Sequence, residues 1–119
     1  MRCVIQRVSS AAVHVDGIEV GSIDQGLLVL VGFGRDDDET VVEPMLNKLL
    51  KLRIFADEEG KMKHNVVDVN AKMLLVSQFT LYGSLKRDIV QVLLRHAHQI
   101  QPGRFMMPFS PKPKLCILV

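Results

Sequence analysis

Residues 73–82 read MLLVSQFTLY, an apolar run that turns polar at its middle. On a β-strand successive side chains point to opposite faces, so Ser77 shares one face with Phe79. Gln78 and Thr80 project together on the other face. A polar group buried without a partner costs about 1–3 kcal/mol, which favours a strand end over a core for these residues. The stretch therefore predicts a strand that ends either in a functional cleft or at a solvent-exposed sheet edge.

Strand patterns precede this stretch. Over residues 3–8, Val4, Gln6 and Val8 alternate with Cys3, Ile5 and Arg7. Ala11, Val13 and Val15 then lead to Asp-Gly at 16–17, which is followed by Ile-Glu-Val at 18–20. Asp-Gly between alternating segments is the strongest short hairpin signal. Gly26 begins the continuous apolar run GLLVLVGF, which is typical of a central strand covered on both faces. We therefore expect a strand, a hairpin and then a central strand.

Helical patterns occupy two later segments. Asp36 to Asp38 favour the positive N-terminal end of a helix, and Pro44 is tolerated only in its first turn. Apolar residues follow at helical spacing, and basic residues close the segment: Val42, Met45, Leu46, Leu49 and Leu50, then Lys48, Lys51 and Arg53. A second stripe, over residues 88–100, predicts another helix.

The remaining segments complete the predicted fold. Residues 52–55 predict a short strand, 56–61 predict a polar turn, and 62–70 fit no single pattern. After Pro102 we expect a loop, with 115–119 as the candidate for a late strand. The order contains no alternating βαβ unit. It predicts an α+β domain, with a mixed or antiparallel sheet or a partly closed barrel packed on a long helix.

Length and composition limit the class of protein. A chain of 119 residues with 48% hydrophobic content is expected to form one globular domain. Its longest apolar run is far shorter than the roughly 20 residues that cross a bilayer, and Met1-Arg2-Cys3 begins no signal-peptide core. We expect a cytoplasmic protein with no membrane partner. Cys3 and Cys116 give neither a disulfide framework nor metal-ligand spacing, so both are predicted to be reduced core thiols.

The charge distribution changes near Asp88. All 13 acidic and 11 of the 15 basic residues lie within residues 1–88, whereas residues 89–119 hold four basic residues and no acidic one. Four of the five prolines also lie in that last part. Two interpretations fit: a basic, irregular tail that contacts a polyanion, or a segment that was not selected to complete this fold.

Six short segments carry a resemblance to a known family. They are Gln6-Arg7-Val8, Val15-Asp16-Gly17, GLLVLVG at 26–32, LRIF at 52–55, DEEGKM at 57–62 and VSQFTL at 76–81. In this order and spacing the chain resembles the D-aminoacyl-tRNA deacylases, also called D-tyrosyl-tRNA deacylases, over residues 1 to about 87. The serine-glutamine-x-x-leucine signature of that family falls on Ser77, Gln78 and Leu81.

The resemblance implies a deacylase-like fold and hydrolysis of the ester that links a D-amino acid to the terminal ribose of tRNA. It implies a homodimer without a metal or an organic cofactor, with a pocket at the dimer interface near this strand. The residues that it implies in catalysis are Ser77, Gln78, Phe79 and Thr80, with Arg7 and Leu81 on the substrate side. In the family, the arginine matching Arg7 helps hold the partner subunit's recognition loop; taken alone, Arg7 is interpreted as an exposed cation.

Two mechanisms remain open for the ester. The first makes Thr80 the nucleophile, but a hydroxyl needs a base within hydrogen-bond reach, and the four histidines are candidates by residue type only. The second uses the ribose 2′-hydroxyl of the substrate, with backbone N–H groups at 78–80 stabilising the oxyanion. We favour the second mechanism.

Basic residues near the predicted first helix also have two interpretations. They either meet tRNA phosphates or belong to ordinary solvated faces of a helix and a turn. The residues concerned are Lys48, Lys51, Arg53, Lys61 and Lys63.

The chain departs from the family pattern after residue 87. Family members continue with a proline-x-phenylalanine segment, a helix and a late glycine-proline pair that excludes L-amino acids, whereas Pro102-Gly103 has the reverse order here. We expect residues 1–119 to form one deacylase-like domain, incomplete at its C-terminus, in which 88–119 diverge through an altered reading frame, a misplaced splice junction or genuine divergence. Two other functions stay open: a non-catalytic nucleic-acid-binding protein and an inactive truncated paralogue.

Overall fold

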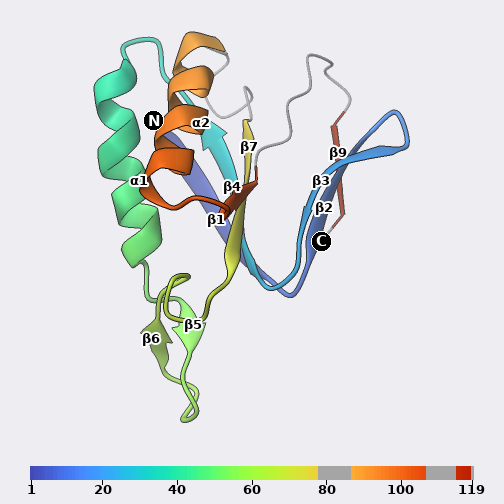
Figure 1. Cartoon of the computed structure of the whole chain (residues 1–119), viewed down its shortest axis with the longest axis vertical. Helices are drawn as coiled ribbons and strands as arrows, with labels where there is room; N and C mark the ends of the chain where they lie inside the picture. The colour runs from blue at the N-terminus through green and yellow to red at the C-terminus, as the bar shows by residue number, and fades with distance from the viewer. Residues whose placement is uncertain (78–86, 107–114, 119) are drawn as a thin grey trace.

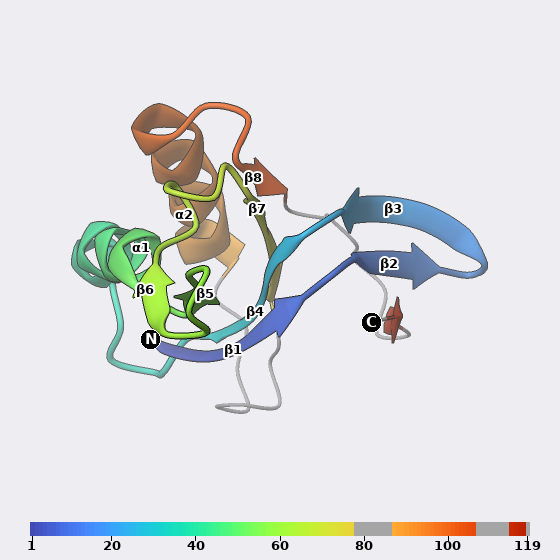
Figure 2. The same cartoon turned by 90° about the horizontal axis from the view of Figure 1, so that it is seen from below.

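The computed structural model describes residues 1–77, 87–106 and 115–118 (Figure 1). Its main sheet has the order β1-β4-β7-β8, from β1 (Arg2–Val8), β4 (Gly26–Gly32), β7 (Lys72–Ser77) and β8 (Phe105–Met106). β1 is antiparallel to β4, while β4, β7 and β8 are parallel to one another. Helices α1 (Val42–Lys51) and α2 (Arg87–Ile100) lie on one face of this sheet (Figure 2). The mixed sheet confirms the predicted α+β class, and no closed barrel forms among these residues.

A second sheet and a short arm complete the architecture. The second sheet has the order β3-β2-β9, from β2 (Ala11–Val15), β3 (Ile18–Ile23) and β9 (Leu115–Leu118). Asp16 and Gly17 have φ angles of 51° and 80°, as a two-residue hairpin turn requires, so the predicted hairpin is confirmed. The arm consists of β5 (Phe55–Ala56) and β6 (Met62–His64) and projects beyond the end of α1 (Figure 1).

Alternating side chains of the central strands divide the core between the two faces of the main sheet. Odd-numbered residues of β4 and β7 pack with the helices, and even-numbered residues pack with the β2–β3 hairpin. The helix-side cluster contains Leu27, Val29, Val31, Met73 and Leu75; the hairpin-side cluster contains Leu28, Leu74 and Val76. Each such side chain contributes about 1.5–3 kcal/mol when fully buried. The prediction that the run from Gly26 forms a central strand covered on both faces is confirmed.

The helices bury the stripes that their spacing predicted. The short 3-10 helix η1 (Glu39–Val41) leads into α1, and the Asp38 carboxylate accepts a hydrogen bond of 2.9 Å from the backbone N–H of Thr40. This cap satisfies an N–H group that the first turn leaves without a partner. The buried side chains are Val42, Leu46, Leu49 and Leu50 in α1, with Leu93 and Ala97 in α2. Both predicted helices are therefore confirmed.

The structure corrects the expectation that the chain contains no βαβ unit. β4 and β7 are parallel neighbours joined through α1, and β7 and β8 are joined through α2. Parallel neighbours need a crossover of this kind. The pattern was missed because the arm of β5 and β6 interrupts the first crossover. The second crossover ends in the two-residue strand β8, where a loop was expected after Pro102.

Three further segments differ from their predicted form. Residues 52–54, expected to begin a strand, form an irregular link, and β5 begins only at Phe55. Of the strand predicted over 73–82, β7 extends to Ser77, and residues 78–82 lie outside the described residues. Cys3 is half-buried at the margin of the helix-side cluster rather than fully inside it. Within the described segments, no helix is long and apolar enough to cross a membrane.

Arg104 ties the segment after α2 to the main sheet. Its guanidinium donates to the backbone carbonyl of Ala71, and the backbone N–H of Met73 donates to the Arg104 carbonyl at 2.9 Å. The next residue, Phe105, is buried in the helix-side cluster. The part of the chain after residue 87 thus supplies α2, β8 and β9, and its turn before β8 is hydrogen-bonded to the start of β7.

Arg7, near the end of β1, braces the arm. Its Nη1 donates to the backbone carbonyl of Ile54 at 2.8 Å and lies 3.2 Å from the sulfur of Met62. Ile54 directly precedes β5, and Met62 begins β6. One guanidinium therefore contacts the segments on both sides of the arm and links them to an edge strand of the main sheet.

We predict that Gly26→Ala destabilises the protein by about 3 kcal/mol or more, because a close-packed backbone cannot yield at low cost. A Cβ at this position would lie 1.9 Å from the carbonyl oxygen of Lys72, between β4 and β7. Gly60→Ala is the control: its Cβ meets nothing within 4 Å, and only its φ of 80° opposes the substitution, at a cost of about 1–2 kcal/mol. Urea denaturation measures both changes. Equal losses in the two variants would contradict the close contact.

We predict that Arg7→Ala loosens the arm. Loss of the bond to the Ile54 carbonyl should lower the free energy of unfolding by about 1 kcal/mol and raise amide hydrogen exchange in residues 54–64, while exchange in β4 stays slow. Arg53→Ala removes a neighbouring exposed cation and is the matched control. If exchange in the arm is the same in both variants, Arg7 is not the brace.

Candidate functional site

β4 and β7 end, and β1 begins, at one edge of the main sheet, which we call the Ser77 edge. Ser77 closes β7 and pairs with Val31 of β4, which pairs in turn with Cys3 of β1. In open sheets with parallel strands, ligands bind in the crevice outside the carboxyl ends of those strands. The polar end of the sequence stretch therefore begins at the edge of the sheet where ligand sites of this fold type form.

Ser77 continues the alternation seen along β7. It shares strand parity with Met73 and Leu75, whose side chains pack toward the helices, and it is half-buried where those two are buried. The predicted site residues Gln78, Phe79, Thr80 and Leu81 follow directly and lie outside the described residues. Of the segment predicted to be catalytic, the structure thus describes its first residue and the strand that leads into it.

The loop after β4 is held at the same edge. The Asp37 carboxylate accepts a 2.6 Å hydrogen bond from the backbone N–H of Gly34 and pairs with the amino group of Met1. These contacts join the end of β4 to the start of β1 across a separation of 36 residues. A carboxylate between two donors of this kind orders the loop beside Ser77. Sequence reasoning had assigned Asp37 only to the helix N-terminus.

Cys3 is the described thiol nearest to Ser77 in the strand register. Burial of its side chain raises the pKa of the Cys3 thiol to about 11, and the positive amino terminus only partly opposes this shift. At neutral pH the group is therefore an uncharged thiol, and a thiol is a far weaker nucleophile than a thiolate. Cys3 fills space beside the strand ends and is not suited to attack an ester.

Arg7 does not lie near Ser77 within one chain. Arg7 pairs with Leu27, which pairs with Met73, four residues before Ser77 in β7. At roughly 3.3 Å per residue these positions are separated by about 13 Å along the sheet. The two ends of the predicted site, Arg7 and Ser77, are thus at opposite ends of the parallel strands, and Arg7 is engaged with the arm.

Candidate bases and metal ligands are not gathered at this edge. The histidines lie on β2, β6 and α2, and none lies on β1, β4 or β7. Among residues 1–77, 87–106 and 115–118, no three His, Cys, Asp or Glu side chains come together as metal ligands do. Ser77 and the residues after it therefore stay the predicted site residues at this edge.

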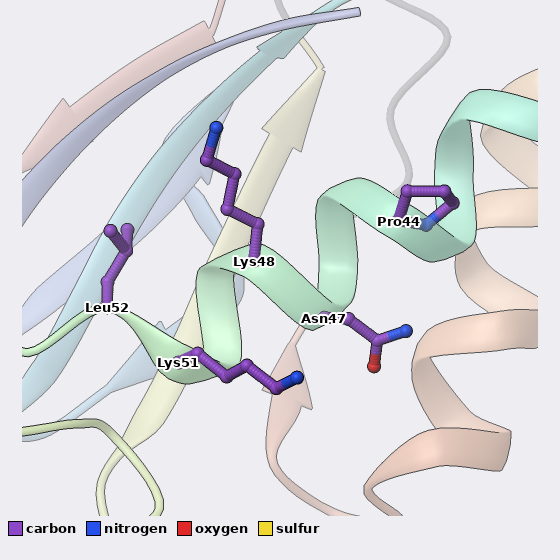
Figure 3. Close-up of a pocket in the computed structure, with 5 residues that line it drawn as sticks. All are labelled: Pro44, Asn47, Lys48, Lys51 and Leu52. Atoms are coloured by element: carbon purple, nitrogen blue, oxygen red, sulfur yellow. The ribbon is translucent and has the colours of Figure 1, made fainter.

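Open depressions occur elsewhere on the surface. One of about 410 Å³ lies over the outer side of α1 and is lined by Pro44, Asn47, Lys48, Lys51 and Leu52 (Figure 3). Another, of about 390 Å³, lies at the amino ends of β4 and β7 and includes Asp24, Gln25, Asn70 and Lys72. The second lies at the opposite end of the parallel strands from Ser77.

Comparison with known proteins identifies the family of the chain. The family model described as D-Tyr-tRNA(Tyr) deacylase matches residues 4–104, which includes β4, β7 and α2. A D-aminoacyl-tRNA deacylase of Thermosipho africanus is 51% identical over 87 residues, covering 73% of this chain and 58% of the relative. One of Vibrio parahaemolyticus is 47% identical over 110 residues, covering 92% of this chain and 76% of the relative. The chain thus spans less than two thirds of the length of the first of these relatives.

Solved structures agree on the fold. The c-Myc DNA Unwinding Element Binding Protein matches with a TM-score of 0.88 and 29% identity, covering 98% of this chain and 89% of the other. A probable eukaryotic D-amino acid tRNA deacylase matches with a TM-score of 0.74 and 12% identity over 98% of this chain and 92% of the other, which supports the fold alone. Because the family model spans most of the sequence and relatives near 50% identity cover it widely, the chain belongs to the D-Tyr-tRNA(Tyr) deacylase family.

Proposed function

We propose that this protein hydrolyses the ester bond of D-aminoacyl-tRNA and releases free tRNA and the D-amino acid. The observation that carries the proposal is Val76-Ser77 in the last described part of a parallel strand, in a chain that belongs to the deacylase family. The curated relatives named above are D-aminoacyl-tRNA deacylases. Such an activity acts on tRNA in the cytoplasm, which is where we propose that the protein works.

The proposed chemistry rests on the backbone after Ser77. Ester hydrolysis develops negative charge on the carbonyl oxygen, and one well-placed donor contributes about 2.7–4 kcal/mol to the transition state. We assign this role to the N–H groups at residues 78–80, with Ser77, Gln78, Phe79 and Thr80 forming the catalytic segment. A β-strand anchored in two core clusters is a rigid base for such donors, because its position is fixed from both faces.

The proposed attacking group is water, assisted by the substrate. The neutral Cys3 thiol and the absence of histidine from β1, β4 and β7 give no support for a side-chain nucleophile with its base at this edge. The ribose 2′-hydroxyl lies next to a 3′-ester, where it orients the water and passes its proton to the leaving 3′-oxygen, so that the water oxygen bonds the carbonyl carbon as the bond to the ribose breaks. In this mechanism the protein positions the ester and stabilises the oxyanion, and it needs no metal or organic cofactor.

The working form is proposed to be a homodimer. Arg7 and Leu81 are assigned to the substrate side, yet within one chain Arg7 is about 13 Å from Ser77 along the sheet. Because of this separation, we assign Arg7 to the pocket of a partner subunit and not to the pocket of its own chain. The half-exposed Val4 on the outer strand β1 is consistent with further burial by a second copy.

We predict that the purified protein releases D-tyrosine from D-tyrosyl-tRNA well above the spontaneous rate. L-tyrosyl-tRNA, assayed in parallel, measures how far the chain rejects L-amino acids with the sequence Pro102-Gly103 in place of a glycine-proline pair. Acid gel electrophoresis of the tRNA separates charged from free molecules. A folded protein that binds tRNA without hydrolysing either substrate would support the binding-protein alternative, and one that does neither would support an inactive paralogue.

We predict that Thr80→Ala retains activity within about tenfold, because the proposed donors are backbone groups, whereas Thr80→Pro loses at least 100-fold, as expected when an oxyanion donor is removed. The proline variant lacks the N–H at this position. Single-turnover rates on D-tyrosyl-tRNA provide the measurement, and circular dichroism checks that both variants fold. An inactive but folded Thr80→Ala protein would instead make the Thr80 hydroxyl the nucleophile.

A further inference from the structure

Basic side chains gather at the end of the molecule opposite to the Ser77 edge. We call this surface the basic end and define it by Lys48, Lys51, Arg53, Lys61 and Lys63. All five residues are exposed. They come from the last turn of α1, from the link after it and from the arm, which lie together at the foot of the molecule in Figure 1.

The fold assembles the basic end from separate segments. Lys48 and Lys51 belong to α1, whereas Lys61 and Lys63 flank Met62 at the start of β6. The guanidinium of Arg7 joins the link after α1 to the start of β6, because it bonds the carbonyl of Ile54 and lies 3.2 Å from the sulfur of Met62. Arg53 precedes Ile54 directly. This contact therefore links the segment that carries Arg53 to the one that carries Lys61 and Lys63.

Four of the five basic residues form no ion pair with the described part of the chain. Among the described residues, Lys61 pairs with Glu59 at 3.5 Å, and both side chains of that pair are about three-quarters exposed. No ion pair is formed by Lys48, Lys51, Arg53 or Lys63 with a described residue. The nearby Asp57 is engaged with the backbone N–H groups of Glu59 and Lys61 in the turn of the arm. Lysines in a last helical turn also offset the helix dipole, but this does not account for Arg53, Lys61 or Lys63.

The surface between Lys48 and Lys51 contains a depression to which both lysines contribute. The two lysines and Asn47 border the depression of about 410 Å³ over α1, and Pro44 and Leu52 complete its lining (Figure 3). In Figure 3 the two ammonium groups point to different sides of the helix. Two ammonium groups that point apart can contact successive phosphates along a nucleic acid strand better than they can enclose a single anion.

The separation of the basic end from the Ser77 edge also suits a nucleic acid partner. β7 has six residues and spans roughly 20 Å at about 3.3 Å per residue. A partner that reaches from the Ser77 edge past the amino end of β7 must therefore be elongated, as a nucleic acid arm is. We propose that the basic end binds the phosphodiester backbone of the tRNA acceptor arm whose aminoacylated 3′ end occupies the Ser77 edge. This inference rests on the proposed function.

The test measures binding of uncharged tRNA by fluorescence anisotropy across a range of salt concentrations, so it does not depend on turnover. The variant is Lys48→Gln with Lys51→Gln, and Lys48→Arg with Lys51→Arg keeps both charges. Lys72→Gln is the matched control, because Lys72 is an equally exposed lysine at the start of β7, outside the basic end. Thermal unfolding of each variant checks the fold.

We expect the double glutamine variant to bind tRNA about 3- to 30-fold more weakly at low salt and to reduce the slope of log Kd against log salt by about 1.5–2. The arginine pair and Lys72→Gln should leave both quantities close to wild type. A minihelix of the acceptor arm should bind as tRNA does, and a CCA trinucleotide should not respond to the lysine substitutions.

The outcomes separate this inference from the proposed function. Equal binding by the wild type and the double glutamine variant overturns the inference, whether or not D-tyrosyl-tRNA is hydrolysed. Lysine-dependent binding without hydrolysis supports the basic end as a tRNA-binding surface and argues against the proposed hydrolase activity. Equal, lysine-dependent affinity for a DNA duplex of the same length as the minihelix would show a general polyanion surface and overturn the assignment to tRNA.

Discussion

The parallel pairing of β4 with β7 is the constraint on which the rest of the structure depends. It places two carboxyl ends at one edge, and the antiparallel β1 then begins at that same edge. The pairing brings the backbone of Gly26 so near to the Lys72 carbonyl that no Cβ fits between them. It also buries both faces of the two strands, since one set of side chains meets the helices and the other meets the hairpin. Ser77 is therefore attached to the part of the molecule with least freedom to move.

The sequence predicted those elements whose signals are local. The turn at Asp16 and Gly17, the apolar run from Gly26 and the stripe of α1 each depend on neighbouring residues, and each prediction is confirmed. The sequence did not predict the crossovers, because they depend on pairing between residues far apart in the chain. Pairing between β4 and β7 spans the whole of α1 and the arm, and β8 is too short to show a period. The resemblance read from short motifs faded near residue 87, whereas the family model continues to residue 104.

The features of the candidate site also fall into two groups, those that the local sequence predicts and those that depend on contacts between distant residues. The change from apolar to polar residues within 73–82 predicted a strand end, and the structure describes this strand as far as Ser77. The position of Arg7 relative to Ser77 follows from two registers in succession, which no local pattern contains. Its bond to the Ile54 carbonyl spans 47 residues and is likewise invisible in the sequence. The loop at Asp37 is held by the ion pair between the Asp37 carboxylate and the amino group of Met1. This contact also depends on the sheet, which places the start of β1 beside the loop.

The two roles that we propose for the two ends of the parallel strands make different physical demands. Stabilising a developing oxyanion requires donors held within a fraction of an ångström, which favours backbone groups on a strand fixed from both faces. Attraction of a phosphodiester backbone requires charge but little geometric precision, so long, exposed lysines on a helix and an arm are sufficient. Exchanging the two roles would fail: a lysine side chain is too mobile to replace a fixed N–H group, and buried strand amides carry no net charge to draw a polyanion. The distribution of rigid and flexible groups along the sheet thus supports a substrate that is bound along its length and cleaved at its tip.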